Sequence, residues 1–259
     1  MKQTKKIFFV LSIFILTLYS CSNDTDDSIK LLKKVVETSA QGTEVTTLFT
    51  YNGTEIVRIE GAQKRTVFTY TDGLITKVVT LNKTNQQSET IEYSYLLGKL
   101  VEVESLGNYR ISYIHNSDKT VSYQKFTIGS GNQEVKEFHG TLYFENENLI
   151  KEERILDNTV AGVASNYSIS FDYDSNSNPL YNVLGYKKLL NHMETISSNN
   201  SLINTVITTT TNGNQVLSSA NFYKSSFKYD SDNYPTEQVS ETALLANGNR
   251  GYLKREYFY

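Results

Sequence analysis

The chain has 259 residues, of which 39% are hydrophobic and 20% charged, and its formal net charge at pH 7 is −3. Without residues 1–20, which contribute three lysines and no acidic residue, 22 basic residues stand against 28 acidic ones and the net charge is −6. A mildly acidic protein has no basic field that would hold a polyphosphate, so we expect no nucleic-acid partner. The single cysteine excludes a disulfide bond within the chain.

The N-terminus has the pattern of a secretory signal peptide. Lysines at positions 2, 5 and 6 precede an apolar run at residues 7–18, and a short segment then leads to Cys21. A transmembrane anchor is the alternative, but a run of 12 residues is shorter than the roughly 17 to 25 residues that a spanning helix needs. We therefore predict that residues 1–20 are removed.

The residues around the predicted cleavage site resemble the bacterial lipobox, in which a leucine stands three positions before a lipid-bearing cysteine and a small residue stands directly before it. Leu18, Ser20 and Cys21 occupy these positions, and Cys21 is the only cysteine of the sequence. The alternative is an incidental thiol, which requires the single cysteine to fall at this place by chance. The resemblance implies lipidation of Cys21 and attachment to the membrane through that lipid.

The next segment, residues 21–30, predicts a lipidated N-terminus and a flexible tether. Its acidic stretch Ser22–Asp27 is similar to the signal that routes lipoproteins of Bacteroidetes to the cell surface, and Asp27-Ser28-Ile29 is similar to the O-glycosylation acceptor of that group. An ordinary solvated linker is the alternative, because such a composition buries too little apolar surface to order itself. The sequence thus predicts an outer-membrane lipoprotein with a candidate glycosylation site at Ser28, on either the periplasmic face or the cell surface.

Residues 31–259 have the composition of a single all-β domain, since tyrosine, phenylalanine and threonine favour strands and asparagine and serine favour turns. A tyrosine-containing strand followed by a turn recurs along this domain, first at Leu48–Val57 and then at Val67–Val78. Asn52-Gly53 and Asp72-Gly73 supply the positive φ that tight hairpin turns demand. Weaker copies cover residues 91–95, 111–116, 142–150, 171–179, 227–235 and 255–259.

These copies resemble the YD-repeat (RHS-like) family, whose core is Tyr-Asp followed by a turn and an apolar or basic run. Tyr173-Asp174 and Tyr229-Asp230 carry the dipeptide, and the whole mature chain resembles YD-repeat lipoproteins of unknown function from Bacteroidetes. The resemblance implies an antiparallel meander of repeated β-hairpins and no particular activity. The spacing between the tyrosines varies, which favours hairpins with variable loops, so we predict that the meander forms a curved sheet or roll.

Two segments depart from the hairpin pattern. Leu180–Met193 places Leu184, Leu189 and Leu190 at intervals that fit a short helix or a loop crossing between parts of the sheet. Residues 29–37 also have helical spacing, but the β-branched residues at positions 35 and 36 favour a strand. We therefore expect one irregular segment late in the domain.

The sequence holds no recognisable catalytic motif. His115, His139 and His192 lie far apart and in no metal-ligand spacing, so surface or turn histidines are the simplest interpretation. Glu137 would share a face of a strand with His139, but two residues do not make a metal site. Nucleophile elbows and phosphate-binding loops are missing, and carboxylates at alternate strand positions arise by chance in a β protein. We expect no cofactor and no enzymatic activity.

Alternating oxygen-bearing residues near the end of one predicted hairpin copy are candidate metal ligands. Asp172, Asp174, Asn176 and Asn178 present such side chains at every second position, as in a calcium loop. The sixth position of this series is Ser177 rather than glycine and the twelfth is not glutamate, so the pattern differs from an EF-hand. Asp and Asn side chains that bond to the backbone amides of a turn are the alternative.

Exposed tyrosine rings are the remaining candidate surface, because they stack on sugars or anchor protein partners. A cross-strand ladder that stabilises the sheet is the alternative role, and the absence of tryptophan disfavours carbohydrate binding. The sequence therefore favours a noncatalytic interaction or scaffold protein of the cell envelope. A glycan-binding surface lipoprotein is the second interpretation, and an envelope hydrolase is the third.

Overall fold

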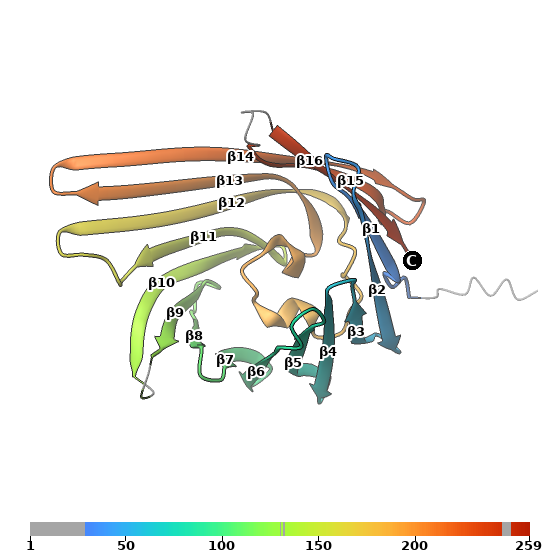
Figure 1. Cartoon of the computed structure of the whole chain (residues 1–259), viewed down its shortest axis with the longest axis horizontal. Helices are drawn as coiled ribbons and strands as arrows, with labels where there is room; N and C mark the ends of the chain where they lie inside the picture. The colour runs from blue at the N-terminus through green and yellow to red at the C-terminus, as the bar shows by residue number, and fades with distance from the viewer. Residues whose placement is uncertain (1–28, 130, 132, 245–249) are drawn as a thin grey trace, which may run out of the picture.

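The computed structural model describes residues 29–129, 131, 133–244 and 250–259, and these form a closed antiparallel β-barrel of 16 strands (Figure 1). The strands are β1 (Lys34–Thr38), β2 (Glu44–Asn52), β3 (Glu55–Glu60), β4 (Lys64–Thr71), β5 (Leu74–Asn82), β6 (Ser88–Leu96), β7 (Lys99–Ser105), β8 (Tyr109–His115), β9 (Val121–Ile128), β10 (Glu134–Glu145), β11 (Asn148–Leu156), β12 (Val163–Ser177), β13 (Asn199–Asn212), β14 (Gln215–Tyr229), β15 (Pro235–Leu244) and β16 (Arg250–Phe258). Two short 3₁₀ helices, η1 (Tyr186–Leu189) and η2 (Glu194–Ile196), lie between β12 and β13.

The predicted hairpins are present where the sequence places them. The copies at 48–57 and 67–78 form β2–β3 and β4–β5, and Asp72 and Gly73 in the second turn have φ of 51° and 73°. Such left-handed conformations match a two-residue turn to the twist of its strands. The predicted strand at residues 29–37 begins later, at Lys34, and is β1.

The prediction of an all-β antiparallel meander is confirmed, but the prediction of an open curved sheet or roll is wrong. β1 pairs with β16, so that Val35 stands opposite Tyr257 at the other end of the chain. Closure pairs backbone groups that both terminal strands would otherwise expose. Local periodicity reports which residues form strands and carries no signal for a pairing between the two ends of the chain.

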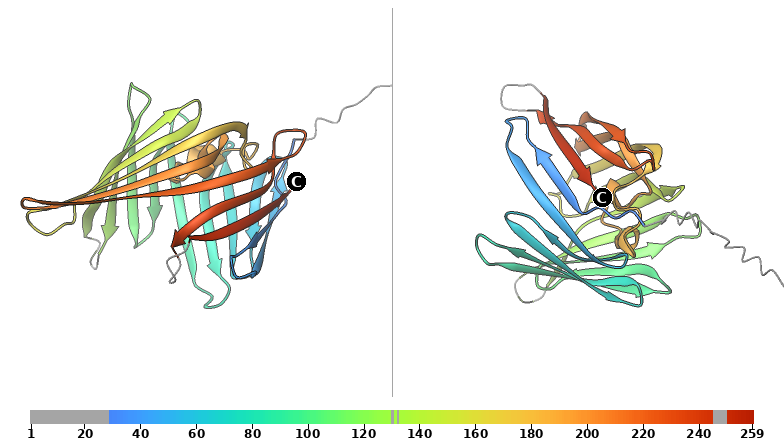
Figure 2. Two further views of the ribbon diagram at one scale, coloured as in Figure 1. Left: turned by 90° about the horizontal axis from the view of Figure 1, so that it is seen from above. Right: turned by 90° about the vertical axis from the view of Figure 1, so that its right-hand side faces the viewer.

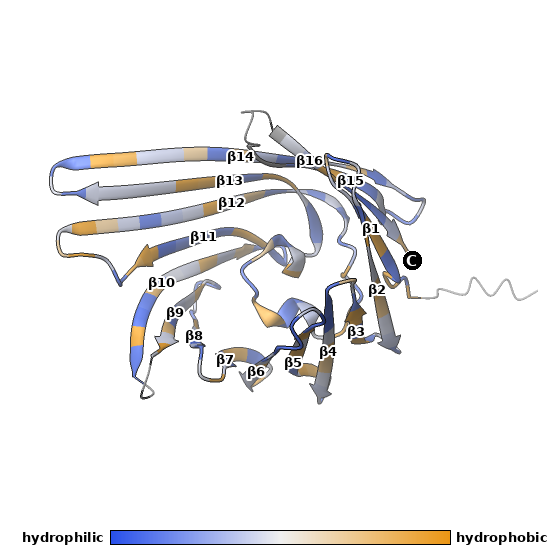
Figure 3. Cartoon of the chain, viewed as in Figure 1, coloured by the Kyte–Doolittle hydropathy of each residue, from blue (hydrophilic) through white to orange (hydrophobic). Residues whose placement is uncertain are grey.

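Successive side chains of a strand point to opposite faces, so they alternate between the lumen and the outer wall, and the strands carry both hydrophilic and hydrophobic residues along their length (Figure 3). The inward side chains form two buried clusters. The first cluster contains Leu100, Val103, Tyr113, Val121, Tyr123, Phe138, Leu142, Leu149, Phe171, Leu190 and Ile196. The second contains Ile56, Phe68, Ile75, Val78, Val183 and Leu189.

Residues 178–198, here called the crossing segment, run through the interior of the ring of strands (Figure 1). Leu189 joins one buried cluster and Leu190 the other, so the segment packs against both parts of the wall. The hydroxyl of Tyr70 in β4 also donates to the carbonyl of Leu184 over 3.1 Å. The predicted short helix or crossing loop is therefore confirmed. Among the described residues, no helix is long and apolar enough to cross a membrane.

Several of the repeated tyrosines share one role, which is to bind successive hairpins to each other. The hydroxyl of Tyr95 donates to the carbonyl of Ile75 over 2.8 Å, and that of Tyr173 donates to Leu149 over 2.7 Å. Burial of the Tyr95 hydroxyl raises its pKa to about 12. Each of these two rings lies in the lumen, and its hydroxyl donates to a carbonyl of the preceding hairpin. This role explains why tyrosine recurs in the repeat.

Candidate ligand site in the lumen

A cavity of 480 Å³ lies between the wall of β6–β11 and the crossing segment. Apolar side chains such as Ile91 and Ile111 and the rings of Tyr93 and Tyr109 form part of its lining. A hollow that combines apolar side chains and rings with several polar groups has the composition of a small-molecule site. Its charged lining residues come from β9, β10 and β11, and they determine which ligands would fit.

Lys125 of β9 points into this cavity because it lies at every second position with the buried residues Val121 and Tyr123 and so shares their face of the strand. Its ammonium nitrogen lies 3.0 Å from the carboxylate of Glu137. The same nitrogen lies 5.1 Å from the ring centroid of Tyr109 and 5.3 Å from another ring in β10. The side chain of Lys125 keeps 24% of its surface exposed, so it is in reach of a ligand.

Glu137 and His139 do not share a face of β10, contrary to the expectation from their spacing. A register shift between Lys136 and Phe138 inserts a bulge at this point of the β9–β10 pair. Glu137 therefore lines the cavity beside Lys125, while His139 pairs with Asp157 at 2.8 Å. The extra residue of a bulge reverses the alternation of side chains, which a regular strand pattern does not reveal.

Glu152 of β11 is the centre of a charged network beside the cavity. Its side chain is only 2% exposed, and its carboxylate accepts a hydrogen bond from the hydroxyl of Tyr123. Arg154 donates to the same carboxylate over 2.7 Å, and Nδ1 of His192 lies 3.2 Å from it. A buried carboxylate with three such partners is satisfied, as burial of a charge requires.

The network holds Glu152 in its ionised form. Burial opposes ionisation, but the hydrogen bond and charge of His192, the hydrogen bond from Tyr123 and the charge of Arg154 outweigh it and lower the pKa of Glu152 to about 2. The guanidinium of Arg154 lies 4.3 Å from the ring centroid of Phe138 and lines the cavity. The site therefore presents Lys125 and Arg154 to the cavity, with each of the two cations already next to one carboxylate.

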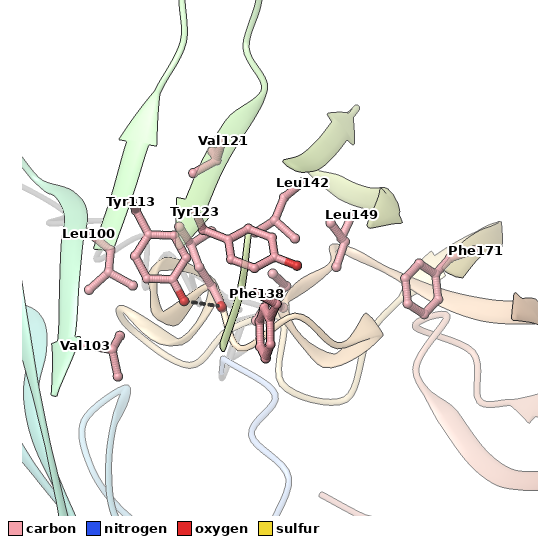
Figure 4. Close-up of a cluster of buried hydrophobic side chains, with 11 residues drawn as sticks. Leu100, Val103, Tyr113, Val121, Tyr123, Phe138, Leu142, Leu149 and Phe171 are labelled. Atoms are coloured by element: carbon pink, nitrogen blue, oxygen red, sulfur yellow. Dashed lines mark hydrogen bonds between the residues drawn. The ribbon is translucent and has the colours of Figure 1, made fainter. Parts of the chain in front are cut away.

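His192 connects the crossing segment to the wall of the barrel. Its Nε2 lies 3.0 Å from the hydroxyl of Tyr113, and its ring centroid lies 4.4 Å from that of Tyr123. Figure 4 shows the rings of Tyr113, Tyr123 and Phe138 gathered in this part of the lumen. One ring nitrogen of His192 contacts Tyr113 and the other contacts Glu152, so both are engaged. His192 therefore holds the crossing segment against β8 and β11.

A second cavity of 280 Å³ lies on the other side of the crossing segment, against β1, β2 and β14–β16. Arg255 of β16 donates to Glu37 of β1 over 2.8 Å, so an ion pair joins the first and last strands inside the lumen. The hydroxyl of Tyr257 donates to Gln238 of β15 in the same region. These groups satisfy each other and close the barrel.

The outer wall of the barrel carries ion pairs on many of its strands. Lys77 and Glu92, for example, alternate with the inward-facing Val78 and Tyr93 and lie 2.9 Å apart across β5 and β6. Outward pairs of this kind are Glu60–Arg65, Lys77–Glu92, Glu102–Arg110, Arg110–Glu134, Lys151–Glu153, Lys228–Glu237 and Lys254–Glu256. Ion pairs therefore recur on the outer wall among exposed apolar side chains such as Leu48, Val67 and Ile114, while the lumen combines buried apolar clusters with a few ion pairs.

The residues of the predicted calcium loop make hydrogen bonds within the protein. The carboxylate of Asp174 accepts from the amides of Asn176 and Asn200 over 2.9 and 3.1 Å. The side chain of Asn178 accepts from the amide of Leu180 over 2.9 Å. In the described residues, no group of three or more His, Cys, Asp or Glu side chains is placed to hold a metal ion. Calcium binding by Asp172, Asp174, Asn176 and Asn178 stays a prediction.

The other predicted site residues lie elsewhere. The predicted lipidation site Cys21 and the predicted glycosylation site Ser28 are outside the described residues. His115 contacts the carbonyl of Leu100 at 2.9 Å. The sequence analysis did not predict the lumen site, although one signal was present: Lys125 lies on the same face of its strand as Val121 and Tyr123, which are buried.

No family model matches the chain, and no curated protein matches it. Among solved structures, a porin-like protein from Bacteroides vulgatus aligns over 89% of this chain and 98% of its own length, with a TM-score of 0.55 and 15% sequence identity. A porin-like protein from Bacteroides uniformis aligns over 88% of this chain and 97% of its own, with a TM-score of 0.48 and 10% identity. The first similarity shows that this chain shares the barrel fold of that protein.

Proposed function

We propose that the chain is a noncatalytic lipoprotein of the cell envelope, held to the outer membrane by a lipid on Cys21, whose barrel stands in water and binds a small ring-shaped acid in its lumen. One observation carries this proposal, which is the polarity of the barrel. Ion pairs recur around its outer wall, while a cavity inside, lined by apolar and polar side chains, holds two cations, Lys125 and Arg154.

This polarity argues against a bilayer-spanning pore, the role that the description of the similar proteins as porin-like suggests. A membrane-spanning barrel presents an apolar band about 25 Å tall to the lipid, and each lysine or arginine at the bilayer midplane costs about 2–4 kcal/mol. Here outward charges recur from β3 to β16. The crossing segment also fills part of the lumen through which a solute would pass.

The lining of the cavity supports a ligand with one ring and one acidic group. Tyr93, Tyr109 and Phe138 offer ring faces and edges for stacking. Lys125 and Arg154 offer charge-assisted hydrogen bonds, but Glu137 and Glu152 already offset both cations. A single carboxylate or sulfonate therefore fits better than a polyanion. An acidic sugar meets the same requirement, so a glycan ligand is the second candidate.

Substitution of Lys125 by methionine is expected to weaken binding of an aromatic acid by at least tenfold, because the side chain keeps its length and loses its charge. The probe is 1-anilinonaphthalene-8-sulfonate, titrated against the folded protein by fluorescence. Lys77→Met is the matched control, since Lys77 pairs with Glu92 on the outer wall. Equal affinities for Lys125→Met and the unmodified protein would contradict a lumen site. Competition by a uronic acid but not by benzoate would favour the glycan candidate.

A further inference from the structure

The outer parts of β12, β13 and β14 extend beyond the rest of the barrel (Figure 2, left). β11 ends at Leu156, and β15 reaches β14 only at Ser225. In the wing, defined as residues 163–166, 207–212 and 215–221, β11 still pairs with Asn166, and the part beyond this pair is a sheet of three strands. Every residue from 215 to 221 is exposed, and Val216 and Leu217 keep 64% and 75% of their surface accessible.

The wing has a long strand edge at residues 215–221 of β14. These residues pair with β13 in an unbroken register, and in the described part of the chain no strand pairs with their other side. The opposite edge of the wing is covered locally, because the hydroxyl of Thr159 donates to the carbonyl of Val163 and the amide of Val163 donates to Val160. The edge of β14 thus presents backbone donors and acceptors to another chain.

The composition of this edge favours pairing. Residues 195–223 contain no lysine, arginine, aspartate or glutamate, although 20% of the chain is charged. Exposed edge strands are normally protected by charges, prolines or bulges, and residues 215–221 have none of these. A regular, uncharged edge of this kind is a template for a further antiparallel strand.

We propose that the edge of β14 pairs with the same edge of a second copy of this chain, about a twofold axis, to form a continuous six-stranded sheet from two wings. A twofold pairing sets each residue near its own counterpart, so a charged edge would repel itself, and this uncharged edge does not. Insertion of the wing into a bilayer is the competing use of an uncharged surface. Backbone groups of an open edge have no partner in lipid, which disfavours that use.

The test is sedimentation velocity of the Cys21→Ala chain in detergent-free buffer, with lysine at both Val216 and Ala220 in one variant and glutamate at both in another. A pairing centred on Ser218 brings position 216 of one copy next to position 220 of the other. We expect micromolar self-association of the parent chain, at least tenfold weaker association of each variant alone, and recovery in an equimolar mixture of the two.

Recovery in the mixture separates this proposal from a loss of folding, because two misfolded variants would not restore each other. Val67→Lys is the matched control, since Val67 is exposed on the outer wall in a strand with both edges paired, and it should leave association unchanged. A parent chain that stays monomeric at several hundred micromolar would overturn the proposal. Unweakened association of both variants, or binding of the parent wing to lipid vesicles in place of self-association, would overturn it as well.

Discussion

Replacing Gly140 with alanine is expected to destabilise the barrel by more than about 3 kcal/mol, because β10 has no room for a side chain at this inward position. A Cβ atom there would overlap the carbonyl oxygen of Glu153 and approach the hydroxyl oxygen of Tyr123 to 2.5 Å. Neither neighbour can move away easily, because the carbonyl of Glu153 belongs to the backbone of the paired strand and the hydroxyl of Tyr123 is hydrogen-bonded to Glu152. Urea unfolding followed by far-UV circular dichroism measures the loss.

Gly61→Ala is the control for this substitution. The nearest atom to a Cβ at Gly61 is the carbonyl oxygen of Lys64 at 3.6 Å, which is an ordinary contact. We expect a change of less than about 0.5 kcal/mol in this variant. Similar stabilities for Gly61→Ala and Gly140→Ala would show that the close packing of Tyr123 against β10 is not as described.

Replacing Glu152 with glutamine is expected to lower the free energy of unfolding at pH 7 by about 3 kcal/mol. The substitution removes a negative charge whose side chain is only 2% exposed and leaves the partly buried Arg154 without its ionic partner. Glutamine keeps the shape of the side chain, so the loss measures charge rather than packing. Glu153→Gln is the matched control, because Glu153 is 45% exposed and pairs with Lys151 on the outer wall, where we expect less than about 0.5 kcal/mol.

The effect of Glu152 is expected to depend on pH. The pKa of Glu152 is about 2 in the folded barrel and about 4.5 in an unfolded chain. The stability that the ionised carboxylate contributes is therefore fully present above pH 4.5 and is lost as the pH falls toward 2. The difference in unfolding free energy between the unmodified protein and Glu152→Gln should therefore shrink over this range. Unfolding curves at pH 7, 4 and 3 measure it. A difference that is constant across these pH values would contradict the ionised network.

Much of the fold was predictable from local residue patterns. Asn52-Gly53 and Asp72-Gly73 marked hairpin turns, and the copies that contain Tyr70 and Tyr95 marked strands. These features act within a few residues of each other, so a single sequence reports them. The irregular composition of residues 180–193 likewise marked a segment that does not continue the meander.

The closure of the barrel and the lumen site were not predictable in the same way. Closure depends on Val35 meeting Tyr257, and the network depends on Glu152 meeting His192, which approach only once the whole barrel forms. The bulge at Glu137 also changed which side of β10 this residue occupies. Long-range pairings and single-residue register shifts leave no periodic trace, and both decide the chemistry of the lumen.

The central claim, a lipid-tethered barrel that stands in water, is tested most directly by flotation with liposomes after extraction without detergent. The lipidated protein and its Cys21→Ala variant are mixed separately with vesicles and centrifuged through a density gradient, and the vesicles are assayed for ion conductance. We expect the lipidated protein to float without conducting, and the variant to stay in the dense fraction as a folded, soluble barrel. A Cys21→Ala variant that enters the vesicles and makes them conduct ions would contradict the account.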